Sequence, residues 1–274
     1  MYTAFNVKLD LSFFSDIKEY IEIGKNQKNI LESTVNKDIK NYVLANEIID
    51  GEKIIGNWFK TIKSDVFLSH SHNDTDLVFA FAGFLKKELD LNVFIDELVW
   101  SSADDLLKII DNEYAYQPSS KTYNYKLRNL TTSHVHSMLS TAIQSIMDNS
   151  ESIFFLNTDE SFPCIGDIVR DDNPYTLSPW IFQEVQNAKL LKITDWSEYR
   201  KETLLEHSAF ASKKLNIAYK TPINEFAQLT SDDIQKWHKK YINRVNEPYN
   251  GIFIDYPDHA LNYLYETVFE RYKI

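Results

Sequence analysis

The chain has 274 residues, of which 43% are apolar, 14% aromatic and 25% charged. This length allows a large domain to bury a full core, and a content of only 6 Gly and 7 Pro excludes a linker or a low-complexity chain. Asp and Glu outnumber Lys and Arg by 40 to 29, so the net charge is -11. This balance disfavours nonspecific binding to nucleic acid or to anionic lipid. We therefore expect a folded protein with a small-molecule partner and with no nucleic-acid or membrane partner.

The chain has a single cysteine, Cys164. One thiol excludes an internal disulfide and a multi-thiolate zinc site, which fits a reducing compartment and predicts a cytoplasmic protein. The densest apolar run, Val78–Leu85, ends at two lysines. It is too short to cross a bilayer, and the first residues lack the pattern of a signal peptide, so we expect neither a membrane span nor a signal peptide.

The first 63 residues are rich in lysine and asparagine. Apolar side chains recur there at helical spacing, as in Phe13, Ile17 and Ile21. This spacing predicts a helical N-terminal leader over residues 1–63.

A strand, a helix and a second strand follow within about 30 residues, the length of one βαβ unit. The β-type run at Asp65–Ser69 ends in a polar loop, residues 76–89 carry apolar side chains on one helical face, and Asn92–Ile95 is again short and apolar. The two strands of such a unit are parallel and its crossover is right-handed. The pattern therefore predicts an open α/β fold.

The same pattern recurs further along the chain. Residues 134–147 have helical spacing and lead into a buried strand at Ser152–Leu156, whereas residues 111–133 are rich in tyrosine and without a period, which indicates an insertion. Ser178 and Pro179 are typical of an N-cap and a first helical position, so a helix is expected from there to Leu190. Strands are expected at 215–219 and 251–255, and helices at 231–241 and 260–272.

Ligands of open parallel sheets bind at the carboxyl ends of the strands, where the loops converge. Three loops are therefore candidates for the site: residues 69–74, 96–104 and 157–179, the last of which leads into the helix that carries Trp180 and Glu184.

These segments together resemble a Toll/interleukin receptor (TIR) domain. The residues that carry the resemblance are Asp65–Ser71 (DVFLSHS), Val93–Asp96 (VFID), the helix and strand around Leu139–Ser145 and Ser152–Leu156, and Ser178–Val185 (SPWIFQEV), which contains the family's Trp-x-x-x-Glu motif. The resemblance covers a TIR domain at residues 64–222, with residues 223–274 as a C-terminal segment packed on it or completing it. It departs from the family pattern at Ser101–Asp104, where a glycine is missing, and in the insertion at 111–133.

The resemblance implies a flavodoxin-like parallel sheet and an enzyme that cleaves nicotinamide from NAD⁺, with Glu184 as the catalytic residue. The nicotinamide of NAD⁺ is a cationic leaving group that departs neutral, so no general acid is needed. A single carboxylate therefore suffices to hold the ribose hydroxyls and to stabilise an oxocarbenium-like transition state. NAD⁺ is then the substrate, and no cofactor is expected.

Five further residues are expected to bind the nucleotide. Ser69, His70 and Ser71 follow the first strand, where hydroxyl groups can donate to ribose or phosphate, although such residues also cap turns. Trp100 is expected to stack on a ring of the nucleotide or to pack against its own loop. Trp180 and Glu184 are four residues apart and share a helix face, so the indole is expected to wall the same pocket, although a tryptophan alone is more often part of a core.

A metal is not expected. His70, His72 and Asp74 have donor atoms suited to zinc or manganese, but neighbouring loop residues more often bond to backbone or solvent. His134 and His136 form a weaker pair, and Cys164 has no evident base beside it.

Three functions remain open from the sequence. The preferred hypothesis is a TIR NAD⁺ glycohydrolase or cyclase of a bacterial antiphage system of the Thoeris type, which self-associates through its TIR domains and has a phage-derived trigger and a separate effector protein as partners. The alternative is a TIR interaction scaffold without catalysis. The third hypothesis is a nucleosidase or deoxyribosyltransferase that acts on free nucleosides.

Overall fold

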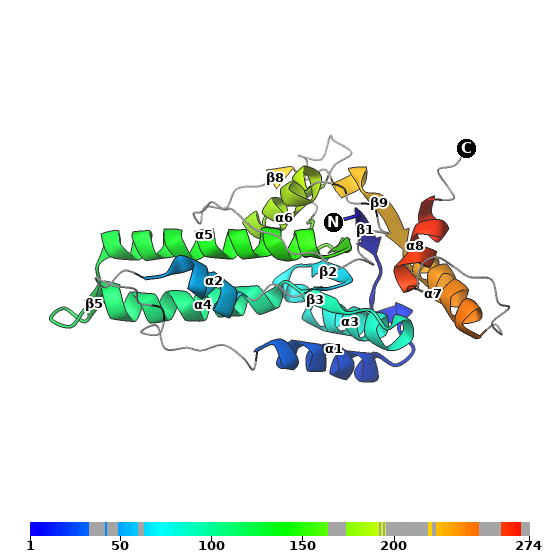
Figure 1. Ribbon diagram of the computed structural model, residues 1–274, viewed down its shortest axis with the longest axis horizontal. Coiled ribbons are helices and arrows are strands. Elements are labelled where there is room, and N and C mark those ends of the chain that lie inside the picture. Colours follow the sequence, from blue (N-terminus) through cyan, green and yellow to red (C-terminus); the bar gives the residue numbers. More distant parts are fainter. Residues whose placement is uncertain are drawn as a thin grey trace.

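A computed structural model describes residues 1–32, 42, 49–59, 63–163, 174–191, 193, 195, 219–220, 223–246 and 259–269. Its centre is a parallel sheet of five strands in the order β3-β2-β6-β1-β9. The strands are β1 (Thr3–Lys8), β2 (Val66–Ser69), β3 (Val93–Ile95), β6 (Ser152–Leu156) and β9 (Ala227–Thr230). The predicted α/β class is confirmed, and the parallel sheet flanked by helices is consistent with a flavodoxin-like fold (Figure 1).

Alternate residues of the strands enter two separate cores, one on each face of the sheet. In β2, Val66 and Leu68 belong to one core and Phe67 to the other, and β6 divides in the same way. Every residue of β2, β3 and β6 is buried. A strand covered on both faces needs apolar side chains at successive positions, which explains why these strands read as continuous apolar runs.

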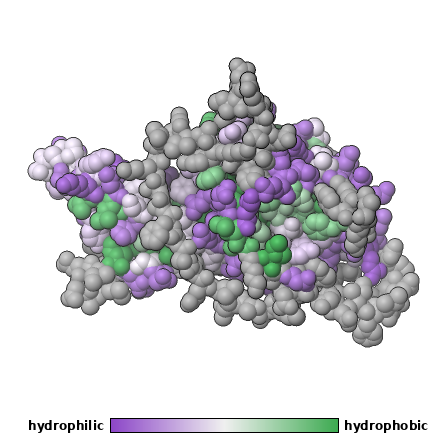
Figure 2. All heavy atoms as spheres, turned by 90° about the horizontal axis from the view of Figure 1, so that it is seen from above, coloured by the Kyte–Doolittle hydropathy of each residue, from purple (hydrophilic) through white to green (hydrophobic). Residues whose placement is uncertain are grey.

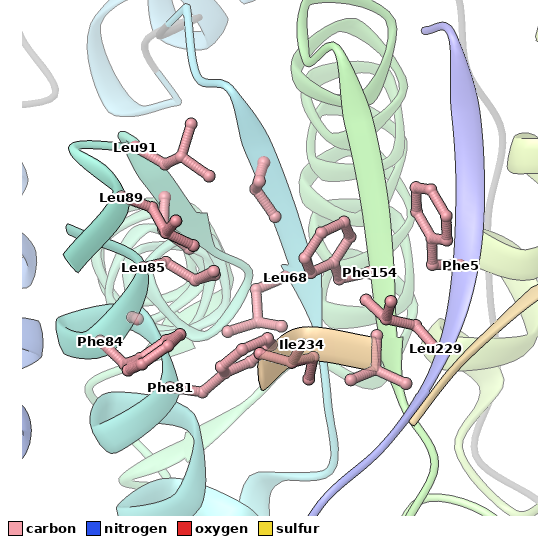
Figure 3. Packing of buried hydrophobic residues seen from close by; sticks show 14 of the residues in the cluster. Phe5, Leu68, Phe81, Phe84, Leu85, Leu89, Leu91, Phe154, Leu229 and Ile234 are labelled. Carbon is pink, nitrogen blue, oxygen red and sulfur yellow. The ribbon is translucent and has the colours of Figure 1, made fainter. Parts of the chain in front are cut away.

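Helices from distant parts of the chain cover the two faces. One core, shown in Figure 3, lies under α1 (Ile17–Glu32), α3 (Thr75–Leu89), α7 (Ser231–Asn246) and α8 (Ala260–Phe269). The other lies under α2 (Gly51–Trp58), α4 (Glu97–Ile110), α5 (Tyr125–Asn149) and α6 (Pro179–Leu190). The expected helices at 178–190, 231–241 and 260–272 are confirmed with small shifts at their ends. Short 3-10 turns occupy Leu11–Phe13 (η1), His72–Asp74 (η4) and Ile223–Glu225 (η8).

The N-terminal segment differs from the expected helical leader. Residues 3–8 form β1, which lies inside the sheet between β6 and β9, with Phe5 opposite both Phe154 and Ala227. The prediction of helix is therefore wrong for this stretch, although α1 and α2 are helical as expected. The physical reason is that β1 is stabilised by strands far along the chain, and local spacing carries no information about such partners.

Helices α1 and α3 approach each other closely at two glycines. A Cβ atom on Gly83 would lie 1.9 Å from the backbone oxygen of Tyr20, and one on Gly24 would lie 2.2 Å from the backbone oxygen of Phe79. Both distances are far below van der Waals contact, so only glycine permits this approach. The helix of the leader is thereby fixed to the first helix of the βαβ unit.

The tyrosine-rich insertion is the end of a helical arm. Helix α4 continues through a π-helical turn (η5, Asp111–Ala115) into a hairpin of β4 (Tyr116–Gln117) and β5 (Thr122–Tyr123), and α5 then returns along α4 to the sheet (Figure 1). Asn124 caps α5 by accepting a hydrogen bond from the backbone N–H of Leu127. Two expectations are corrected here: α4 begins at Glu97, so residues 97–104 are not a loop, and α5 begins at Tyr125, nine residues before the expected start.

The remaining elements lie at the carboxyl side of the sheet. Strand β7 (Tyr175–Thr176) precedes α6, strand β8 (Tyr219–Lys220) follows it, and the two strands form an antiparallel ladder. The strand expected at 215–219 lies outside the described residues except for Tyr219, and the strand expected at 251–255 lies entirely outside them. Among the described helices, none has both the length and the apolar character that crossing a bilayer requires.

Candidate functional site

Ser69 and Glu184 meet at the carboxyl end of β2. The hydroxyl group of Ser69, the last residue of that strand, donates a hydrogen bond of 2.6 Å to Oε2 of Glu184. Only 1% of the surface of each residue is exposed. Ser178 caps α6 by accepting from the backbone N–H of Ile181, and the helix that starts there carries Glu184 over the end of the strand. The sequence placed both residues in the site, and the structure brings them into contact.

The carboxyl group of Glu184 is in an unfavourable place for a negative charge. Burial is the main cause that raises its pKa well above the usual glutamate value, and the nearby Asp96 raises it further, whereas the hydrogen bond from Ser69 acts in the opposite direction. Among the described residues, Oε1 has no hydrogen-bond partner. An unpartnered buried oxygen is costly in a fold, and at a site it offers an acceptor to a ligand.

His70 and Asp96 form a second buried contact at the same edge. Nδ1 of His70 lies 2.5 Å from Oδ1 of Asp96, and the side chains are 2% and 4% exposed. The backbone N–H of His70 also donates to Oδ2 of Asp96 at 3.4 Å. Asp96 follows β3, and the pairing of Leu68 with Ile95 places it next to the end of β2. The imidazole is thus directed at a carboxylate within the protein.

Ser71 has a different role in the structure. Its hydroxyl group accepts from the backbone N–H of Asn73 and so caps the turn η4, and its backbone N–H donates to Oγ of Ser161 at 3.0 Å. Ser161 in turn donates to Asp74, which also accepts from Thr158 at 2.6 Å. The loop after β2 is therefore tied to the loop after β6. Ser71 therefore caps a turn, which is the alternative role expected from the sequence. A contact between Ser71 and a nucleotide stays a prediction.

Neither tryptophan is placed against the Glu184 carboxyl group by a described interaction. Trp180 lies edge-on to His136 of α5, with ring centroids 5.3 Å apart, and packs on the core of that face. Burial lowers the pKa of His136 below its usual value, which favours the neutral ring in this contact. Trp100 belongs to α4, but its side chain lies outside the described residues, as does Cys164.

Asp96 is a site residue that was not predicted from the sequence, where it appeared only as the end of the segment Val93–Asp96. The available signal was the βαβ unit itself. Its two parallel strands are neighbours, so the residues that follow them, His70 and Asp96, emerge side by side.

A cleft lies at the same edge, further toward β1. Its volume is about 770 Å³, and the loops after β1, β2 and β6 line it. Four aspartates are among its lining residues: Asp10, Asp74, Asp76 and Asp159. Within the described ranges, no three His, Cys, Asp or Glu side chains are grouped closely enough to hold a metal ion. In particular, His70 faces Asp96 while Asp74 faces Thr158 and Ser161, so the two do not converge on a point.

Comparisons with models of known protein families, with curated proteins and with solved structures found no match for the chain.

Proposed function

We propose that the chain is a TIR-type enzyme that cleaves the bond between nicotinamide and ribose in NAD⁺, with Glu184 as the catalytic residue. The observation that carries the proposal is the buried glutamate at the carboxyl end of β2, one oxygen of which accepts from Ser69 while the other has no hydrogen-bond partner among the described residues. This is the edge at which an open parallel sheet binds ligands.

The environment of Glu184 suits a cationic substrate. Burial and Asp96 raise the pKa of the carboxyl group and so favour its neutral form, whereas a positively charged nicotinamide ring and the developing charge on the ribose favour its ionised form. The carboxylate then accepts from the ribose hydroxyls through the oxygen that lacks a partner. Ser69 holds the other oxygen and fixes the orientation of the group.

The chemistry balances with the substrate and water alone. The bond between the ribose C1′ and the ring nitrogen breaks, and its electron pair neutralises the departing nicotinamide. Attack by water on C1′ gives ADP-ribose and releases one proton, whereas attack by a nitrogen or oxygen of the same molecule gives a cyclic isomer and the same proton. The transition state is positively charged, and the carboxylate stabilises it.

The same proposal includes a biological role for the reaction product. A product of this kind can act as a signal for a separate effector, and the resemblance to TIR proteins supports a role in antiphage defence of the Thoeris type, with a phage-derived trigger. The scaffold alternative predicts no product under any condition.

The test is incubation of the purified protein with NAD⁺, followed by chromatography and mass spectrometry. We expect release of nicotinamide by the natural chain, and a loss of at least about 100-fold in Glu184→Gln, the size of effect seen when a group that stabilises the transition state is removed. Glu52→Gln on the exposed side of α2 is the matched control and should keep full activity. Release should rise with pH through the raised pKa of Glu184, because the carboxylate is the active form.

Two outcomes would contradict the proposal. Equal release by the natural chain and by Glu184→Gln would remove Glu184 from the reaction. Cleavage of free nucleosides but not of NAD⁺ would favour the nucleosidase hypothesis instead.

A further inference from the structure

The end of the helical arm exposes an unusual number of large apolar side chains. We call residues 112–130 the arm tip. Tyr125 is 75% exposed and Leu130 is 54% exposed. The other exposed large side chains of the arm tip are Tyr114, Tyr116, Tyr123 and Leu127. In Figure 2 the arm forms the left end of the molecule, where green apolar groups lie among polar ones. A concentrated patch of this kind is typical of an interaction surface.

The arm tip is also basic, although the chain as a whole is acidic. It contains Lys121, Lys126 and Arg128 but only one acidic residue, Glu113, in a chain with a net charge of -11. Arg128 is held by Asp111 at 2.9 Å and lies over the ring of Tyr123. The two lysines are exposed and extend the positive charge to the end of the hairpin.

Lys121 has an unfavourable backbone conformation in the hairpin turn. Its φ of 52° lies in the left-handed region, which glycine and asparagine adopt more easily. A lysine in this conformation lowers stability by about 1 kcal/mol relative to glycine. The turn nevertheless contains a lysine, which adds a positive charge to the hairpin.

The acidic cleft is the complementary surface on the same chain. Its aspartates Asp10, Asp74, Asp76 and Asp159 have no Lys, Arg or His at ion-pair distance among the described residues. Its volume of about 770 Å³ is ample for lysine side chains from a hairpin. In Figure 1 the hairpin is at the far left, whereas the loop between β1 and α1, which contributes to the cleft, is right of centre. One molecule therefore does not bring its own arm tip to its own cleft.

We propose that the arm tip of one copy of this chain docks in the acidic cleft of a second copy. In this contact lysines meet aspartates that have no ion-pair partner among the described residues, and the tyrosines cover apolar surface around them. The two surfaces differ, so the contact is head-to-tail and builds an open chain or a closed ring. Nucleic acid is a poorer occupant of the arm tip, because the rest of the molecule is strongly acidic and repels phosphates. The proposal does not depend on the activity proposed above.

The test measures molar mass by light scattering and sedimentation velocity at rising protein concentration. We expect the mass to rise with concentration at low salt and to fall as salt is added, because exposed charges are screened within about 10 Å at 0.1 M. The variant Lys121→Glu with Lys126→Glu makes the arm tip negative, and the variant Asp10→Lys with Asp76→Lys and Asp159→Lys makes the cleft positive, because Asp74 is then its one remaining aspartate. Each variant alone should stay monomeric, since its tip and its cleft then carry the same sign of charge.

An equimolar mixture of the two variants is the decisive sample. In the mixture every arm tip finds a cleft of opposite charge on the other variant, so assembly should return. Lys236→Glu with Lys239→Glu on α7 makes the same change in net charge elsewhere and should assemble like the natural chain. A natural chain that stays monomeric at all concentrations, a tip variant that assembles normally, or a mixture that stays monomeric would each overturn the proposal. Normal circular dichroism of each variant ensures that the loss is not unfolding.

Discussion

Two buried regions of this molecule differ in the chemistry of their side chains. The contact between α1 and α3 is apolar and close, and it depends on two glycines that let the helix backbones approach. The cluster of Ser69, His70, Asp96 and Glu184 is buried to a similar degree but holds two carboxyl groups together, and Oε1 of Glu184 has no hydrogen-bond partner in the part of the chain that the structure describes. The first region stabilises the fold. In the second region, a negative charge on the buried carboxyl group of Glu184 is unfavourable for stability. Such a difference is expected between a structural contact and a site.

The largest effect is expected from breaking the buried pair in the second region. His70→Gln removes the partner of Asp96 and leaves its carboxylate buried beside Glu184. A buried acceptor left without its partner costs about 1–3 kcal/mol, and more when the acceptor is charged, so we expect a loss of about 3 kcal/mol in the free energy of unfolding. Urea denaturation measures this loss, and His72→Gln, an exposed change two residues away, is the control. Equal stability of the two variants would show that the contact between His70 and Asp96 contributes nothing.

A smaller effect is expected at the contact between α1 and α3. Gly83→Ala places a Cβ atom against the backbone oxygen of Tyr20, so α1 must move away. Inserting a group into a well-packed contact costs about 1–3 kcal/mol, which exceeds the gain in helix propensity. Gly56→Ala in α2 is the matched control, because its Cβ atom meets nothing within 4 Å and should stabilise by up to about 1 kcal/mol. Thermal unfolding of both variants measures the difference, and a stabilising Gly83→Ala would contradict the close approach of the helices.

The smallest effect is expected at Glu184, and it has the opposite sign. The pKa of Glu184 is raised in the folded state, so its contribution to stability is present at low pH and is lost as the pH rises through that raised value. Glu184→Gln keeps an acceptor for Ser69 without the charge. It should therefore stabilise the protein by about 1 kcal/mol at alkaline pH, the usual size of such a gain, and by much less near pH 4. Melting curves across pH measure this, and a gain that is constant with pH would refute the explanation.

Much of the body of the molecule could be predicted from local sequence. The βαβ unit, β6 and the start of α6 follow from apolar spacing and from the Ser178 cap, which act within a few residues. The position of β1 could not be predicted, because its partners Ser152 and Ala227 lie far along the chain. The arm was interpreted as an insertion because its side chains face solvent on most sides, so no apolar period marks its helices.

The candidate site was also predicted only in part, because some of its contacts join residues that lie far apart in the sequence. Ser69 and Glu184 were selected through the resemblance, and the structure places them in contact. The pairing of His70 with Asp96 depends on which strands are neighbours, and Trp180 turned toward His136 because the first turn of α6 faces α5. Side-chain direction of this kind is set by tertiary packing and is not encoded in spacing alone.

The place of β1 in the middle of the sheet has a consequence for how the protein is made. Strand β1 lies between β6 and β9 in the sheet but precedes both of them in the chain. At 5–20 residues per second, β9 is synthesised about 10–45 s after β1. Until then the edge of β1 that pairs with β9 has no partner strand, so the nascent chain presents the backbone groups of that edge to chaperones during this interval.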